Sequence, residues 1–389
     1  MYLKRREFSK MALAAAAAPL GELFAATKPN SIFNGVVIGT ITYSFREAAN
    51  GAASNADTLL KMVVDSGISH IELMPPAAES YAGAPAAPGR GGGGAGGRGG
   101  SGRGGPGGGG GRGTQITSIA PGQSLPVCPV PTADAAAAGG GGGARGGRGG
   151  SGRGGGGGGG GRGAGQTPEQ LAATQAYNDD LKKWRLGVSM DKFKAFGKMY
   201  NDAGVNIYCH KLSPGVNASD AEFDYYFNIA KAMGATQISL EQGPANDHTQ
   251  KLGDFAAKHG MMTAYHAHLQ ATITAWDDLI AQSKGNGVNL DAGHYMAGSG
   301  QSPIPAIEKY AGMGRMCSLH LKDRTSPAHC ELNLPWGQGE TPIVEILQTI
   351  RKNKWKFPAS IELEYQIPEG SDPVTEVKKC LEYCKKALA

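Results

Sequence analysis

The stretch Val288-Asn289-Leu290-Asp291-Ala292-Gly293-His294 is a short apolar run that stops at a carboxylate, with a glycine and a histidine close behind it. Short runs rich in β-branched and apolar side chains are typical of β-strands. Eight of them occur along the chain, at residues 36–43, 70–74, 205–211, 237–241, 262–266, 288–291, 317–321 and 360–365. Several of these runs end on Glu, Asp or His.

Longer amphipathic segments separate these runs, for example at residues 57–64, 190–200, 221–233 and 345–351. Their apolar side chains recur at helical spacing, and residues typical of helix caps, such as Asn55 and Ser219, precede two of them. Alternating strands and helices predict a parallel sheet, and eight strands predict a closed (β/α)8 TIM barrel of the α/β class. The barrel domain is expected at residues 33–389.

A low-complexity Gly/Arg-rich insertion interrupts this domain at residues 88–166. The decapeptide Gly-Gly-Arg-Gly-Gly-Ser-Gly-Arg-Gly-Gly begins at Gly96 and again at Gly146. Such a composition buries too little apolar surface to offset chain entropy, so disorder is expected. The insertion falls in the loop between the second strand and the second helix, on the catalytic face of a TIM barrel. Arginine-glycine repeats resemble RNA-binding tails, but aromatic residues are missing between them, and nucleic-acid binding is not expected.

The first 26 residues resemble a twin-arginine export signal. Lys4-Arg5-Arg6 precedes a short apolar, alanine-rich stretch, and small residues follow near Ala25. The apolar stretch is too short for a stable membrane span, so no membrane association is expected after cleavage. The interpretation places the mature protein in the periplasm or outside the cell.

The six cysteines are too sparse for a disulfide scaffold and show no CxxC spacing. Cys380 and Cys384 stand four residues apart in a predicted helix and are interpreted as buried small side chains. Cys209 is interpreted in the same way.

Polar side chains gather at or just after the ends of the predicted strands, where a TIM barrel builds its active site. They are Glu72, His210, Glu241, His266, His268, Asp291, His294, His320, Lys322, Glu362 and Glu364. Carboxylates together with imidazoles are ligands for a divalent metal. Interpretations without a functional role compete with the active-site interpretation. In these, His210 is a structural histidine, Glu72 is a salt-bridge residue and Lys322 is a solvated lysine at a strand end.

Three motifs in combination resemble the sugar phosphate isomerase/epimerase family with its xylose-isomerase-like barrel: Leu-Asp-Ala-Gly-His at 290–294, His-Leu-Lys-Asp at 320–323 and Tyr-His-Ala-His at 265–268. The resemblance covers nearly everything from about residue 33 onward except the insertion. It implies one divalent cation (Mn, Mg, Co or Zn) held by a Glu, an Asp, a His and a second Glu.

Asp291, His320 and Glu362 match the last three ligands of that set. The fifth strand carries His266 where the resemblance calls for a glutamate. Two candidates for the fourth ligand therefore stay open, Glu241 from the fourth strand and His266 itself. Glu241 is favoured, because a hard dication prefers oxygen.

The resemblance implies an isomerase or epimerase that moves a proton next to the carbonyl of a sugar or keto-sugar through an enediolate. Glu241, Glu362 and His268 are the candidate acid/base residues. The residues expected to contact the carbohydrate are Glu72, His210, His266, His294, Lys322 and Glu364. The alternatives are a metal-dependent lyase or hydratase on keto-sugars or keto-glycosides, and a non-catalytic sugar-binding protein. A homo-oligomer is left open.

Overall fold

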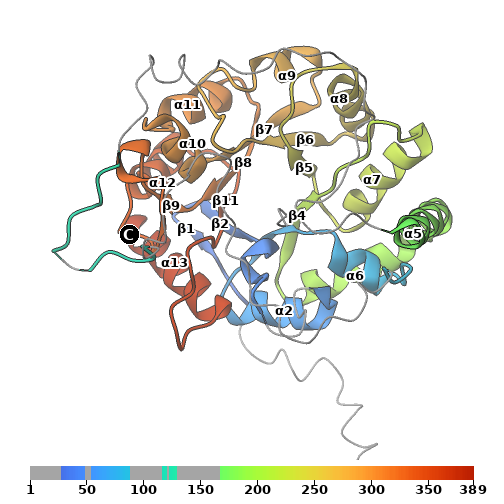
Figure 1. The fold of residues 1–389 in the computed structure, drawn as a ribbon, viewed down its shortest axis with the longest axis horizontal. Helices are drawn as coiled ribbons and strands as arrows, with labels where there is room; N and C mark the ends of the chain where they lie inside the picture. Colours follow the sequence, from blue (N-terminus) through green and yellow to red (C-terminus); the bar gives the residue numbers. More distant parts are fainter. Residues whose placement is uncertain (1–27, 49–53, 88–115, 121, 129–166) are drawn as a thin grey trace, which may run out of the picture.

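The computed structural model describes residues 28–48, 54–87, 116–120, 122–128 and 167–389 (Figure 1). Within this part of the chain, eight parallel strands form a closed barrel, because the last strand pairs with the first and the first pairs with the second. In barrel order they are β2 (Val36–Ile41), β3 (His70–Leu73), β4 (Asn206–Lys211), β5 (Gln237–Glu241), β6 (Met262–His266), β7 (Asn286–Asp291), β8 (Met316–Leu321) and β11 (Ala359–Ile361). The prediction of an α/β TIM barrel is confirmed.

Two further pairings lie outside the barrel ring. The short strand β1 (Ile32–Phe33) runs antiparallel to β2. Beyond β8, β9 (Asp323–Arg324) pairs antiparallel with β10 (Asn333–Leu334) in a small hairpin. The predicted last strand is shorter than expected, so Glu362 and Glu364 lie in the segment that directly follows β11.

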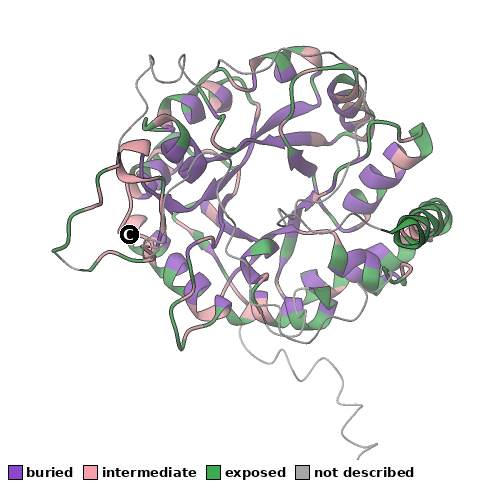
Figure 2. Ribbon diagram, in the orientation of Figure 1, coloured by how far each residue is buried: buried purple, intermediate pink, exposed green. Residues whose placement is uncertain are grey.

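Helices surround the barrel (Figure 1). They are α2 (Ala56–Asp65), α3 (Pro76–Tyr81), α5 (Pro168–Gly187), α6 (Met190–Asp202), α7 (Asp220–Ala232), α8 (Asp247–His259), α9 (Asp277–Gln282), α10 (Ala292–Ser299), α11 (Ile304–Gly312), α12 (Ile343–Asn353) and α13 (Pro373–Ala387), with 3-10 turns η1 (Thr42–Phe45) and η3 (Pro327–His329). The predicted caps are present, since the Asn55 side chain accepts from Thr58 N and Ser219 forms a capping box with Glu222. Helix α5 buries no residue and stands apart as the exposed helix in Figure 2.

Strand alternation separates an apolar layer from a polar lumen. In β7, Val288 and Leu290 belong to the hydrophobic core, whereas Asn289 and Asp291 contact polar groups inside the barrel. The core therefore lies between strands and helices, where buried residues line the inner sides of the helices in Figure 2. The polar side chains are left to fill the barrel itself.

The described part of the predicted insertion, 116–120 and 122–128, lies against the loop beyond β8. Cys128 is disulfide-bonded to Cys330, and its backbone N–H donates to Ala328 O at 2.8 Å. Ile119 N donates to Gln338 Oε1 at 2.7 Å. The sequence did not predict this bridge, because the six cysteines were too sparse to suggest any pairing. The rest of the insertion lies outside the described residues.

The other four cysteines are buried free thiols. This agrees with the interpretation of Cys209, Cys380 and Cys384 as packing residues, and Cys317 is the fourth. The predicted export signal at residues 1–26 lies outside the described part of the chain. Among the described helices, none is long and apolar enough to cross a membrane.

Candidate metal centre

Four side chains from consecutive strands meet at the carboxyl end of the barrel. His266 ends β6, Asp291 ends β7, His320 lies in β8 and Glu362 follows β11. All four are buried, and one ligand atom from each lies within 4.8 Å of the others. We call them the four-residue group. The structure thus brings together the three residues expected to act as ligands and adds His266.

Glu241 lies at the rim of the barrel, apart from this group. Its side chain is 56% exposed, and its carboxylate pairs with Lys211 Nζ at 2.7 Å and with His268 Nε2 at 3.0 Å. Burial would raise the pKa of Glu241, but the hydrogen bond from His268 and the charge of Lys211 lower it well below its usual range. Of the two candidates for the fourth ligand, the geometry therefore favours His266 over Glu241.

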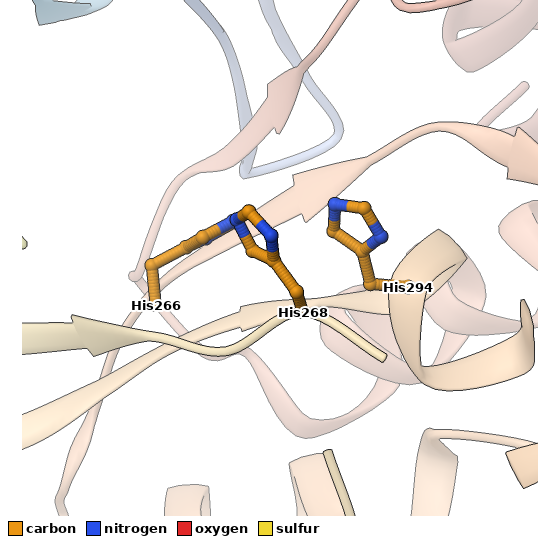
Figure 3. A group of neighbouring side chains, drawn as sticks. All are labelled: His266, His268 and His294. Atoms are coloured by element: carbon orange, nitrogen blue, oxygen red, sulfur yellow. The ribbon is translucent and has the colours of Figure 1, made fainter. Parts of the chain in front are cut away.

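A second cluster, the three-histidine group, shares His266 with the first. His266, His268 and His294 turn their rings toward the same space (Figure 3). The rings of His268 and His294 are stacked with centroids 4.5 Å apart. Lys322 Nζ lies 2.9 Å from His294 Nε2, and Arg324 Nη1 lies 2.8 Å from Nδ1. Burial and these two cations lower the pKa of His294 well below its ordinary value.

Lys322 is a buried cation among carboxylates and not a solvated lysine. Its Nζ lies 2.9 Å from Asp291 Oδ2, 2.9 Å from Glu362 Oε2 and 2.7 Å from Glu364 Oε2. Burial opposes its charge, but the three carboxylates raise the pKa of the ammonium above its usual value. Lys322 therefore stays charged and links both groups of ligand candidates through His294.

A lower polar layer supports the four-residue group from inside the barrel. Glu72 from β3 is fully buried and lies 2.9 Å from His320 Nε2, while Glu362 lies 3.1 Å from Nδ1. Burial would lower the pKa of His320, but the two flanking carboxylates raise it to about 10. Asn289 and Ser239 also donate to Glu72. Glu72 therefore lies beneath His320 and away from the barrel mouth. This position does not suit the contact with carbohydrate that was predicted for Glu72 from the sequence.

His210 is placed away from both groups. It lies in β4 next to Lys211, so the period-two alternation of a strand turns it to the opposite side from the rim pair of Lys211 and Glu241. Its ring is buried, and neither nitrogen has a hydrogen-bond partner among the described residues. Burial and the nearby Arg185 lower its pKa to about 3. This environment suits the structural interpretation better than the predicted contact with carbohydrate.

The four-residue group fits a divalent cation by its donor chemistry. Two carboxylates and two imidazoles suit a borderline transition metal such as Zn2+, Co2+ or Mn2+. Within the described chain, His266 Nδ1 and Asp291 Oδ2 are buried atoms without a hydrogen-bond partner, although Asp291 Oδ2 is ion-paired with Lys322. A buried ring nitrogen without a partner, such as His266 Nδ1, is costly unless a ligand completes it.

The charge balance around the group also fits one dication. Five carboxylates stand against three basic side chains: Glu72, Glu241, Asp291, Glu362 and Glu364 against Lys211, Lys322 and Arg324. A histidine that binds a metal is neutral, so with the histidines counted in that form two negative charges remain. One bound dication would bring the net charge of the site to zero.

Comparisons with known proteins agree with the fold. The family model described as xylose isomerase-like TIM barrel matches residues 174–387. A solved xylose isomerase domain protein from Planctomyces limnophilus is 18% identical, with 51% of this chain and 82% of its own covered and a TM-score of 0.42. A putative uncharacterized protein from Parabacteroides distasonis is 16% identical, with 90% of this chain and 99% of its own covered and a TM-score of 0.47. A D-tagatose 3-epimerase-like protein is 13% identical, with 51% of this chain and 84% of its own covered and a TM-score of 0.41. No curated protein matches the chain.

Proposed function

The chain belongs to the xylose isomerase-like TIM barrel family, and we propose that it is a metal-dependent isomerase or epimerase of a sugar or keto-sugar. The observation that carries this proposal is the buried four-residue group at the carboxyl mouth of the barrel. His266, Asp291, His320 and Glu362 would hold one divalent cation. When bound, that cation would acidify the C–H next to a sugar carbonyl and stabilise the charge that develops on its oxygen.

The rim pair of His268 and Glu241 is the proposed proton-transfer unit. Both side chains are about half exposed, so a substrate in the mouth can reach them. The hydrogen bond that His268 donates to Glu241 raises the pKa of His268, with burial opposing it. An imidazole can take a proton from carbon and return it. In this arrangement His268 moves the proton, and Glu241 orients the ring and stabilises its charged form.

The remaining polar residues of the mouth would orient the carbohydrate. Glu364 is partly exposed, and Lys322 and His294 lie directly beneath it in one hydrogen-bonded chain. These groups offer both donors and acceptors to sugar hydroxyls. A carbohydrate is therefore the proposed partner.

Carbon-bound deuterium uptake from heavy water tests the proposed reaction. The metal-loaded protein is incubated with a panel of aldoses, ketoses and keto-glycosides, and exchange next to the carbonyl is followed by NMR. We expect metal-dependent exchange that falls about 100-fold or more in His268→Gln, as for loss of a general acid/base group. His259→Gln, which removes a histidine paired with Asp224 in the helix layer, is the matched control.

The outcomes of this experiment are distinct. Exchange without net elimination supports an isomerase or epimerase, and net loss of a β-substituent supports the lyase alternative. A protein that binds metal and carbohydrate but exchanges no substrate proton in the whole panel is a sugar-binding protein, and the proposal is then wrong.

We further propose that the protein is exported to the periplasm or beyond. Paired arginines at the start of the chain support this proposal. The Cys128–Cys330 disulfide supports it as well, because such bridges persist mainly in oxidising compartments.

A further inference from the structure

Glu72 contacts the metal-ligand candidate His320 from below. The carboxylate is fully buried at the end of β3, and its Oε2 lies 2.9 Å from His320 Nε2. Ser239 Oγ donates to Glu72 Oε1 at 2.5 Å, and Asn289 Nδ2 donates to Oε2 at 3.1 Å. Donors therefore surround Glu72, and an ionised carboxylate can only accept from them.

The two nitrogens of His320 face different surroundings. Nδ1 lies 3.1 Å from Oε2 of Glu362, which is a member of the four-residue group. Nε2 faces Glu72 and Asn289 in the lower layer. The ring thus spans the boundary between the four-residue group and the layer that supports it.

A neutral imidazole carries one N–H and one lone pair, and the partner of one nitrogen decides which form is present. Glu72 and Glu362 both accept from the metal-free ring, but Glu362 is itself a ligand candidate that a bound cation would engage, so Glu72 then favours the proton on Nε2. The lone pair is then left on Nδ1, which points into the four-residue group. Carboxylates that orient a metal-binding histidine in this way raise metal affinity and fix the ring.

We propose that Glu72 is a positioning residue that holds His320 in the Nε2–H form, so that Nδ1 is the ring atom offered to the metal. This inference rests on the proposed metal site. It assigns Glu72 a role through His320 and no contact with carbohydrate. It also explains why a glutamate is buried at the bottom of a polar lumen, where a structural ion pair alone would add little stability.

Two measurements test the proposal. In the first, Mn2+ affinity is measured by calorimetry for the wild type, Glu72→Gln and the control Glu79→Gln. Glu79 is also a buried carboxylate, but it binds Arg185 and Tyr225 in the helix layer. We expect Glu72→Gln to weaken Mn2+ binding about 10- to 100-fold, as for loss of a supporting carboxylate. Glu79→Gln should leave the affinity within about twofold, although it is expected to lower stability as well.

The second measurement does not depend on any variant folding. In 15N-histidine-labelled wild-type protein loaded with Zn2+, long-range 1H–15N correlations show which ring nitrogen of each histidine carries the proton. We expect one metal-bound histidine with its proton on Nε2 and Zn2+ on Nδ1, whose signals shift in Glu72→Gln and not in Glu79→Gln.

A proton on Nδ1 of every metal-bound histidine, or Mn2+ binding by folded Glu72→Gln as tight as that of the wild type, would overturn the proposal. Its failure is separable from that of the proposed function. If the wild type binds Mn2+ with the expected dependence on Glu72 but exchanges no substrate proton, only the isomerase proposal fails. If the wild type binds no metal, the inference fails with the metal site.

Discussion

Replacing Lys322 with methionine tests whether the buried carboxylates need a cation among them. The ammonium lies within 2.9 Å of Asp291, Glu362 and Glu364, and its side chain is 2% exposed. Removing one partner of a buried ion pair costs about 3–5 kcal/mol, because the remaining charge stays buried without compensation. We expect Lys322→Met to lower the unfolding free energy of the metal-free protein by about that amount.

A bound dication should reverse much of this loss, because it supplies positive charge beside the same carboxylates. The assay is urea unfolding of wild type and Lys322→Met, in EDTA and with saturating Mn2+. Lys379→Met is the control: its ammonium is 60% exposed and pairs with Glu376 at 2.7 Å, so a change below about 1 kcal/mol is expected. A loss of less than about 1 kcal/mol for Lys322→Met in EDTA, or an Mn2+ effect no larger than in the wild type, refutes the reasoning.

Two further predictions concern the Cys128–Cys330 disulfide and the proposed export signal. Converting both Cys128 and Cys330 to serine removes a link between residues 202 apart in sequence. Chain entropy then predicts that the free energy of unfolding in urea falls by up to about 5 kcal/mol. An unchanged unfolding midpoint would contradict this. Replacing Arg5 and Arg6 with lysines should leave the protein in the cytoplasmic fraction on cell fractionation, and normal export of that variant would exclude a twin-arginine route.

The barrel could be predicted from the sequence because eight short apolar runs alternate with longer amphipathic segments. Several strand-end residues have a small polar residue two positions before them, as in Ser239 before Glu241, Asn289 before Asp291 and Ser318 before His320. That spacing puts both side chains in the lumen, so the lower polar layer was also visible in the sequence. Asn289 and Ser239 were nevertheless not among the predicted site residues, which were taken from the strand ends.

The fourth ligand could not be chosen from the sequence, because ligand hardness and position point to different residues. Oxygen preference favours Glu241, but Lys211 and His268 hold that carboxylate at the rim. His266 is buried and lies beside His320 with ring centroids 4.7 Å apart. The side chains of other strands decide whether Glu241 or His266 points into the barrel. A single sequence does not show which residues of different strands contact each other.

The disulfide was hidden for a different reason. Cys128 stands in a glycine-rich tract with no periodic pattern, and Cys330 stands in the loop beyond β8. Their pairing depends on where residues 122–128 lie against the loop between β9 and β10, which composition does not specify. The tether places residues 116–128 beside the β9–β10 hairpin, and Arg324 of that hairpin donates to His294 of the site.

The exchange of a carboxylate for His266 changes the charge of the site as well as its donor atoms. With a third carboxylate ligand in its place, the three basic side chains and one dication would leave a net negative charge in a buried space, which is costly. With the imidazole, Lys322, the two other basic side chains and one dication balance the five carboxylates. Two imidazoles in the ligand set also shift the preference from Mg2+, which prefers oxygen, toward Mn2+, Co2+ or Zn2+. The buried lysine and the buried histidine are therefore best understood together, as one adjustment that lets a single transition-metal dication complete the site.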